Sequence, residues 1–297
     1  MRQLPFVTVD VFTDTRFGGN PLAVFTDGRG VSDTEMQALA AEMNYSETTF
    51  VLPPADPANS ARVRIFNRTA EMPFAGHPNV GTAYVLASAD PAISVLRFEE
   101  IAGLVEVRIV RDGTGAVTGA EIGAPQPLQT LGEMPVAIAP CLGLTPADLR
   151  TDRHLPIRAT TGVDFLFVEV VPEALARATP DPAAYARANA AYPAQSGRLS
   201  IFVYARCGDD PAAGIRARMF SPLTGTWEDA ATGSANATLG ALLLSLTGGD
   251  ALAYEAVQGV EMGRPSRLSV SARRTGDGIF ASVGGQCVPV LRGDASL

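Results

Sequence analysis

The segment Arg64–Ala83, RIFNRTAEMPFAGHPNVGTA, returns in altered form as Arg218–Asn236, RMFSPLTGTWEDAATGSAN. Each copy contains a short stretch typical of a strand, then a loop, then a glycine that opens a run of small residues typical of a helix. A third match supports the repeat, because the spacing ExxxG at residues 99–103 returns at residues 255–259. The chain therefore predicts two related halves, each with a glycine loop at the start of a helix.

The glycine loops point to an anionic ligand. N–H groups in the first turn of a helix have no partner within the helix and carry partial positive charge. Two such ends meeting at a cleft would hold an anion, so we expect function between the halves. Residues 232–235 (TGSA) are the stronger candidate, because small side chains admit a ligand and the hydroxyls of Thr232 and Ser234 add donors. Ordinary helix capping is the alternative.

Composition limits the class of protein. At 297 residues and 46% hydrophobic content, the chain is long enough for two cores. Its net charge of -8, without a cluster of Lys and Arg, argues against nucleic acid or an anionic membrane surface as a partner. The three cysteines lie far apart without a CxxC pair, so neither a disulfide framework nor a zinc site is indicated. With no apolar run near the ~20 residues of a membrane span and no signal-like N-terminus, we expect a cytoplasmic protein.

Local patterns predict strand-rich halves with few helices. A capping box, Ser32-x-x-Glu35, starts a predicted helix that ends near Asn44. Further helices are expected at residues 80–87, 182–191 and through 237–246, and the 182–191 helix is expected at the surface. The Pro-Gln-Pro at 125–127 marks a change of character. We therefore divide the chain into domains 1–126 and 127–297, and allow the C-terminal strand to return to the first domain.

Histidine chemistry is limited to two residues, His77 and His154, and neither lies in an HxxxH or HExxH pattern. A histidine-based metal site is therefore not expected. His77 lies between Gly76 and Pro78 in the first glycine loop, where an ordinary near-neutral pKa suits proton transfer or a hydrogen bond to an anion. The alternative is a loop histidine that caps a turn. His154 lies in no motif and is expected to be structural.

Three carboxylates are candidates for a general acid or base. Glu47 lies at a helix-to-strand junction, while Glu71 and Asp229 flank the two glycine loops. Burial or a neighbouring acid raises the pKa of a carboxylate enough for it to act near neutral pH. Taken singly, each is equally well interpreted as a solvated loop acid.

Several familiar sites are absent from the sequence. There is no Walker-type GxxxxGK[ST], no dinucleotide-binding glycine motif before a helix and no GxSxG nucleophile elbow. The remaining acids, one histidine and anion-binding helix ends suit proton transfer without a cofactor.

These motifs together resemble the phenazine-biosynthesis PhzF family over essentially the whole chain. The motifs that carry the resemblance occur in the same order, as DVF at 10–12, GNPLAVF at 19–25, NYSETTF at 44–50, PFAGHP at 73–78 and EDAATGSA at 228–235. The resemblance implies an α+β fold of two pseudo-symmetric diaminopimelate-epimerase-like domains. Each would be a mixed sheet wrapped as a partial barrel around a central helix. It also implies an active site between the domains, a homodimer and no cofactor.

The resemblance also assigns roles to individual residues. Glu47 would be the general acid and base that removes a C–H proton and returns it to another carbon, while His77 and Asp229 would bind and polarise the substrate. Hydrogen bonds to the substrate would come from five further residues, Ser46, Gly76, Thr232, Gly233 and Ser234. Related racemases place a cysteine in each glycine loop, and neither loop here has one. Two-thiol stereoinversion is therefore disfavoured.

Two departures from the family pattern affect the loops. Ala230 stands where the family has proline, which loosens the loop entry because proline fixes φ. The stretch 67–70 also differs, and Arg68 is either a residue that faces the cleft and alters substrate choice or a solvated loop arginine.

Three hypotheses follow. The leading one is a cofactor-independent isomerase acting on a small, carboxylate-bearing metabolite. The second is an epimerase or racemase that uses Glu47 on one face of a carbon and Asp229 or His77 on the other. The third is a non-enzymatic metabolite-binding or interaction protein on the same scaffold. Retention of Glu47, His77 and Asp229 together argues against the third, because binding alone needs no acid at this position.

Overall fold

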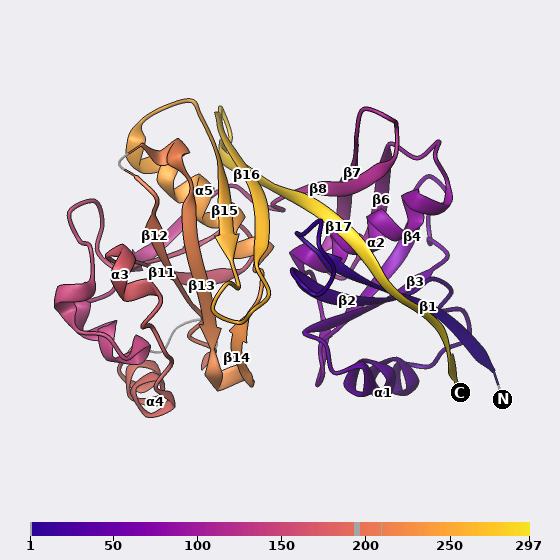
Figure 1. Cartoon of the computed structure of the whole chain (residues 1–297), viewed down its shortest axis with the longest axis horizontal. Helices are drawn as coiled ribbons and strands as arrows, with labels where there is room; N and C mark the ends of the chain where they lie inside the picture. The colour runs from indigo at the N-terminus through magenta and orange to yellow at the C-terminus, as the bar shows by residue number, and fades with distance from the viewer. Residues whose placement is uncertain (1, 193–196, 209) are drawn as a thin grey trace. The chain divides into compact units, whose positions relative to one another are not determined.

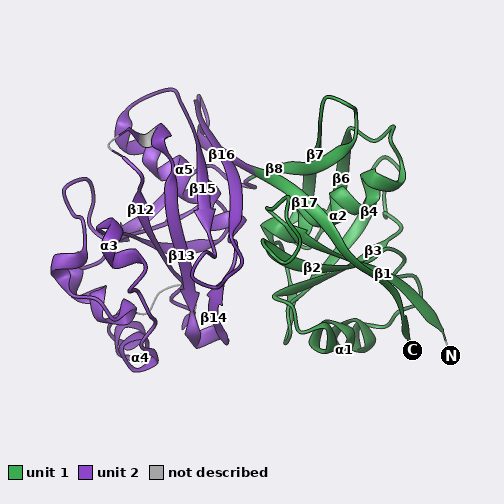
Figure 2. Ribbon diagram, in the orientation of Figure 1, with its two compact units in different colours: residues 1–123, 284–297 green, residues 124–283 purple. Residues whose placement is uncertain are grey.

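The computed structural model describes residues 2–192, 197–208 and 210–297. The chain forms two compact units, residues 1–123 with 284–297 as unit 1 and residues 124–283 as unit 2 (Figure 2). Strand β17, Gly278–Ser296, contributes its first residues to unit 2 and the rest to unit 1. The sequence placed the division after residue 126, and the structure places it after residue 123.

Unit 1 consists mainly of strands, with two helices (Figure 1). In chain order its elements are β1 (Gln3–Val11), β2 (Asn20–Phe25), α1 (Asp33–Met43), β3 (Glu47–Leu52), β4 (Ala61–Phe66), β5 (Glu71–Met72), α2 (Gly76–Ala89), β6 (Val95–Glu100), β7 (Gly103–Arg111) and β8 (Val117–Gly123). Strand pairing runs β17–β1–β2–β3–β4–β6–β7–β8 and returns to β17, with β5 paired to β4. The β2–β3 and β4–β6 pairs are parallel, so the sheet is mixed and closes on itself.

Helix α2 fills the interior of this closed sheet. Residues 76–83 are all buried, and the helix contacts β1, β2, β3, β7 and β8. Small residues make this possible, because a Cβ on Gly81 would lie 2.6 Å from Leu22 Cδ2 and 2.8 Å from Val11 Cγ2. The predicted helix start at residue 80 was too late: Gly76 and His77 are already helical, and Pro78 occupies the first turn, where its missing N–H costs nothing.

Helix α1 packs on the outer face of the same sheet. Ser32 and Glu35 form the predicted capping box, and Asn44 ends the helix in the left-handed conformation with φ 53°. The helix buries Met36 and Ala40 in a cluster with aromatic side chains of β2, β3 and β4. Phe25 and Phe50 stack within it at 4.8 Å between ring centroids. This confirms the predicted helix and its ends.

Unit 2 repeats the plan with additional short helices. Its elements are β9 (Gln129–Glu133), η1 (Val136–Leu142), η2 (Pro146–Asp148), β10 (Ile157–Thr160), β11 (Asp164–Glu169), α3 (Pro172–Leu175), α4 (Pro182–Ala191), β12 (Ile201–Arg206), η4 (Pro211–Ala213), β13 (Ile215–Ser221), η5 (Pro222–Thr224), β14 (Thr226–Asp229), α5 (Gly233–Thr247), β15 (Ala251–Gln258) and β16 (Ser266–Thr275). Pairing runs β9–β10–β11–β12–β13–β15–β16, with β14 paired to β13. Backbone bonds from Ala124 N to Ala281 O and from Leu128 N to Ile279 O join the segment before β9 to the start of β17.

Helix α5 takes the central position in unit 2. It contacts β10, β11, β15 and β16, and residues 235–244 are all buried. A second core lies where η1, α3 and α4 pack on the sheet, with Leu166, Val168 and Tyr185 among its members. Helix α4 has the predicted bounds, 182–191. Each unit is thus a mixed sheet wrapped around a central helix, which confirms the predicted α+β fold.

The close packing of α2 predicts a difference between two glycines. We expect Gly81→Ala to lower the free energy of unfolding by roughly 1–3 kcal/mol, because the new methyl overpacks against two side chains. In α5, a Cβ on Gly240 would lie too close to one atom, Val270 Cγ1 at 2.6 Å. The better helix propensity of alanine, about 1 kcal/mol, should therefore offset more of the stability lost in Gly240→Ala. Urea denaturation of both variants measures the difference. Equal losses would contradict the prediction.

Candidate active site

Each unit carries the same arginine clamp just before its glycine loop. Arg64 Nε and Nη2 donate to Glu71 at 2.7 and 2.6 Å, and Arg218 Nε and Nη2 donate to Glu228 at 2.8 Å each. Each guanidinium also lies over the phenylalanine two residues later, at 5.1 Å for Arg64 and 4.8 Å for Arg218. Glu71 and Glu228 are therefore equivalent, and Glu71 is an ion-pair partner rather than a free acid.

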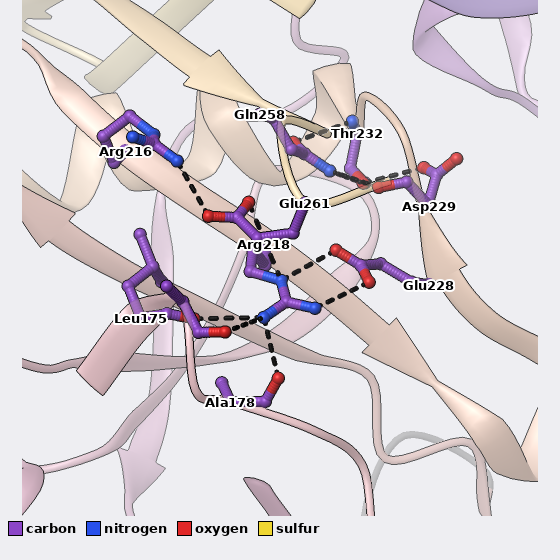
Figure 3. A network of polar contacts seen from close by, with 10 residues as sticks. Leu175, Ala178, Arg216, Arg218, Glu228, Asp229, Thr232, Gln258 and Glu261 are labelled. Atoms are coloured by element: carbon purple, nitrogen blue, oxygen red, sulfur yellow. Dashed lines mark hydrogen bonds and ion pairs between the residues drawn. The ribbon is translucent and has the colours of Figure 1, made fainter. Parts of the chain in front are cut away.

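The clamp in unit 2, which Figure 3 shows, is the more deeply buried of the two. Arg218 Nη1 also donates to the carbonyl oxygens of Leu175 at 3.1 Å and Ala178 at 2.7 Å. The Arg218 and Glu228 side chains are each 8% exposed, whereas those of Arg64 and Glu71 are 14% and 24% exposed. The guanidinium thereby ties β13 and β14 to the segment around α3.

Asp229 follows Glu228 on β14 and points away from the clamp (Figure 3). This is the alternation of a strand, which turns successive side chains to opposite faces. Thr232 Oγ1 donates to Asp229 Oδ2 at 2.7 Å. The structure therefore brings two of the predicted residues, Asp229 and Thr232, into direct contact.

Gln258 on β15 anchors the start of α5. Its Oε1 accepts from the Thr232 N–H at 3.1 Å and from Asn236 Nδ2 at 3.0 Å, and its Nε2 donates to Asp229 O at 2.9 Å and Thr232 Oγ1 at 3.0 Å. The Thr232 N–H is thus already bonded within the protein. Thr232 makes no side-chain cap on α5, so the first-turn N–H groups of Gly233 and Ser234 are the part of the predicted anion site that remains. Gln258 was not among the predicted residues, although it lies within the third match of the repeat, at 255–259.

In unit 1, three predicted residues meet around a buried asparagine. Glu47 begins β3, and its Oε2 lies 3.5 Å from Nε2 of His77 in the first turn of α2. Asn20 Nδ2 lies 3.4 Å from His77 Nδ1, and Ser46 Oγ donates to Asn20 Oδ1 at 3.0 Å. Asn20 was not among the predicted residues, although its place in the motif at 19–25 could have indicated it. The Glu47 side chain is 17% exposed and that of His77 5%, so Glu47 is the more accessible group.

Burial sets the charge of His77. Desolvation lowers the pKa of His77 to about 3, and a hydrogen bond to the Pro21 backbone opposes this only weakly. The near-neutral pKa expected from the sequence is therefore wrong, because the loop that looked exposed lies inside the closed sheet. His77 is neutral at physiological pH and offers one donor and one acceptor nitrogen.

The two units differ at the positions that could move a proton. Thr48 pairs with Phe66 and Ile201 pairs with Phe220, so the preceding residues, Glu47 and Ser200, are equivalent. The glycine loops align through Gly76 and Gly233, which makes His77 equivalent to Ser234 and Met72 equivalent to Asp229. In unit 1, the carboxylate of Glu47 therefore lies beside His77. In unit 2, the carboxylate is that of Asp229, at the end of β14, and the helix carries Ser234 in place of a histidine.

The other singled-out residues lie elsewhere. His154 is 6% exposed, and its Nε2 lies 2.7 Å from the hydroxyl of buried Tyr204, which donates to Glu169 at 3.1 Å. Arg68 is exposed. Ala230, in place of the family proline, is buried, and its carbonyl accepts from Ser266 Oγ at 3.0 Å, which holds the loop entry.

Two further properties concern the described part of the chain. Within residues 2–192, 197–208 and 210–297, no group of three or more His, Cys, Asp or Glu side chains is placed to hold a metal ion. Over the same residues, no helix is both long and apolar enough to cross a membrane.

Two repeated units, each a mixed sheet around a central helix that starts at a glycine loop, define the diaminopimelate-epimerase-like class of α+β folds. The model of the phenazine biosynthesis-like protein family matches residues 9–293, and the chain belongs to this family.

Individual relatives agree with this assignment. The chain is 36% identical over 300 residues to an uncharacterised isomerase of Mesorhizobium japonicum, covering 99% of each chain. It is 35% identical over 282 residues to trans-2,3-dihydro-3-hydroxyanthranilate isomerase of Pseudomonas aeruginosa, covering 93% of each. The crystal structure of a PhzF-family phenazine biosynthesis protein of Bacillus anthracis superposes with a TM-score of 0.86 at 23% identity, covering 100% of each chain. The fold is that of the family, and the protein is an isomerase.

Removing the buried clamp should destabilise unit 2. We expect Arg218→Ala to lower the free energy of unfolding by about 3–5 kcal/mol, because it leaves the Glu228 carboxylate buried and unpaired. Arg64→Ala should cost less, since Glu71 is more exposed. Chemical denaturation monitored by circular dichroism compares the two. A larger loss for Arg64→Ala would refute this ranking of the clamps.

The low pKa of His77 predicts an acid-sensitive contribution to stability. The unfolded state takes up a proton near pH 6.5 and the folded state only near pH 3, so this contribution is present above about pH 6.5 and is lost toward pH 3. Between pH 8 and pH 5, the free energy of unfolding of wild type should fall by about 2 kcal/mol more than that of His77→Gln. Denaturation curves at both pH values measure the difference. Parallel losses would show that His77 keeps an ordinary pKa.

Proposed function

We propose that the protein is a cofactor-independent isomerase that moves a proton between two carbons of a small carboxylate-bearing metabolite. Glu47 is the general acid and base. The single observation that carries the proposal is the position of Glu47, a partly accessible carboxylate 3.5 Å from a buried, neutral histidine. In unit 2, Ser200 occupies the equivalent position, and the His154–Glu169 pair, 3.8 Å apart, has both side chains only 2% exposed.

The proposed chemistry needs one group that serves two carbons. Glu47 removes a proton from one carbon, holds it as the carboxylic acid and returns it to another carbon of the conjugated system. His77 stays neutral and lies beside the reacting groups without transferring a proton. A neutral imidazole suits this role because its proton is too weakly acidic to leave. Asn20 fixes the orientation of the ring, and Ser46 fixes Asn20.

The loop of unit 2 is proposed to bind the substrate. The N–H groups of Gly233 and Ser234 suit a carboxylate at the start of α5. Asp229 would repel a carboxylate, so we assign it to a hydrogen-bond donor of the substrate, such as a hydroxyl or amino group. The prediction from sequence that this loop and Glu47 serve one substrate stays a prediction.

The relatives guide the choice of substrate class. The Pseudomonas aeruginosa relative is named for trans-2,3-dihydro-3-hydroxyanthranilate, an unsaturated cyclic acid with amino and hydroxyl groups. We propose an unsaturated or cyclic carboxylic acid with at least one such donor for this chain. The particular acid is left open, because the stretch 67–70 and Ala230 depart from the family pattern. The homodimer, the absence of a cofactor and the cytoplasmic location are kept as proposals, and sedimentation of the purified chain tests the first.

The epimerase alternative fits the geometry less well. It requires a second proton donor on the opposite face of one carbon. His77 is a poor candidate because its pKa is lowered to about 3, and the Asp229 carboxylate already accepts the Thr232 hydroxyl. The isomerase relatives make the non-enzymatic alternative unnecessary.

Loss of the Glu47 carboxylate tests the proposal. We expect Glu47→Gln to lower kcat by about 10²–10⁴-fold, the usual contribution of a general acid or base. The assay is proton NMR in D₂O over a panel of unsaturated and cyclic carboxylic acids, which reports both isomerisation and deuterium entering a C–H position.

Glu42→Gln is the matched control, because it removes one exposed carboxylate from nearby α1 without touching the site. It should react as wild type. Substrate turnover undiminished in Glu47→Gln would reject Glu47 as the acid and base, and deuterium at one stereocentre with inversion would favour the epimerase.

A further inference from the structure

Glu100, at the end of β6, is a buried acid that the proposed mechanism does not use. Among the described residues, neither of its carboxyl oxygens has a hydrogen-bond partner, and both are buried. The side chain of Asn79, in the first turn of α2, contacts this carboxyl group. Asn79 Oδ1 is itself buried without a partner in the same part of the structure. An ionised carboxylate without a partner is costly to bury, whereas the protonated acid is neutral.

Strand register identifies Glu100 as the counterpart of Gln258. Arg62 pairs with Glu99 across β4 and β6, and its equivalent Arg216 pairs with Val257 across β13 and β15. The next residue is Glu100 in unit 1 and Gln258 in unit 2. This register corrects the third sequence match, which aligned residue 99 with 255 and is displaced by two residues.

The partners of the two residues are also equivalent. Asn79 and Asn236 each lie three residues after the glycine of their loop. Each donates from Nδ2 to the carbonyl of the N-cap residue at 3.0 Å, Ala75 in unit 1 and Thr232 in unit 2. In unit 2 the asparagine also donates to Gln258. A neutral amide therefore anchors α5 at the position where unit 1 has an acid.

We propose that Glu100 is a positioning residue for α2, whose carboxyl group stays protonated and bonds the Asn79 side chain, as the Gln258 amide does for Asn236. It acts on the reaction only through the start of α2, which carries His77. Its role in catalysis rests on the proposed function, while its protonation does not.

The surroundings of Glu100 favour the neutral form. It lines a cavity of about 280 Å³, together with four other charged side chains, those of Arg62, Arg64, Glu71 and Glu99. Arg64 is bound to Glu71, and Glu99 accepts hydrogen bonds from the N–H groups of Ala55 and Asp56. Burial raises the pKa of Glu100 to about 8, and the contact with Asn79 lowers it by a smaller amount. Arg64, Glu71 and Glu99 are thus engaged with other groups.

The test compares Glu100→Gln with wild type and with Glu99→Gln. Glutamine keeps the shape of the neutral acid, so Glu100→Gln should retain the wild-type kcat/KM at pH 7. In wild type and Glu99→Gln, kcat/KM should fall about tenfold between pH 7 and pH 9, and this fall should be absent from Glu100→Gln. The matched control changes the adjacent acid on the same strand, whose pKa is lowered by its hydrogen bonds to Asn59 and to the backbone N–H groups of Asp56 and Ala55.

Two measurements do not depend on catalysis. With ¹³C-labelled glutamate, one carboxyl resonance should titrate near pH 8 in wild type and Glu99→Gln and be missing in Glu100→Gln. The folded pKa exceeds the unfolded value of about 4.3, so the stabilisation is lost as pH rises from there to about 8. The difference in unfolding midpoint, Glu100→Gln minus wild type, should therefore increase as pH rises from about 4.3 to about 8, and should stay constant above about pH 8.

The outcomes separate the two parts of the proposal. No glutamate resonance titrating above pH 7 would overturn the protonated state. A titrating resonance with unchanged alkaline kcat/KM in Glu100→Gln would overturn the positioning role. If no substrate is turned over by any variant, the proposed function fails while the resonance and the unfolding midpoints still decide the state of Glu100.

Discussion

A helix that starts inside a closed sheet must find partners for its first N–H groups without water. Both units face this constraint, since α2 and α5 each begin at a buried glycine and neither has a side-chain cap at its N-cap residue. In both units an asparagine in the first turn donates to the N-cap carbonyl, and in unit 2 Gln258 Oε1 also accepts the N–H of the N-cap residue Thr232. The other N–H groups of the first turn of α5, with their partial positive charge, are those that we propose to bind a carboxylate.

The arginine clamps hold the strand that leads into each loop. A bidentate Arg–Glu pair fixes one face of that strand, and alternation then sends the next side chain to the opposite face. In unit 2 this places Asp229 against Thr232, and in unit 1 the same position is Met72. The clamp is therefore common to both units, whereas the carboxylate that follows it is present in unit 2 alone.

Burial also decides the charge of the groups near α2. His77 loses its proton affinity and Glu100 gains it, because desolvation penalises the ionised form of either group. Glu47 lies beside His77 and is more accessible to solvent than His77. An active site with one accessible carboxylate among neutral partners is suited to shuttle a single proton, since no competing charged group holds the proton in its place.

The sequence by itself determined the repeat, the capped helix at 33–43, the two glycine loops and the family, because these depend on local patterns and on the order of motifs. It also indicated Glu47 and His77, whose contact the structure then located. Only the tertiary structure decided that His77 is buried and neutral beside Asn20, that Glu71 is bound to an arginine, that Gln258 anchors the start of α5, and that the carboxyl oxygens of Glu100 are buried. Those properties depend on strand register and on exclusion of water, which bring together residues far apart in the chain and leave no local signal.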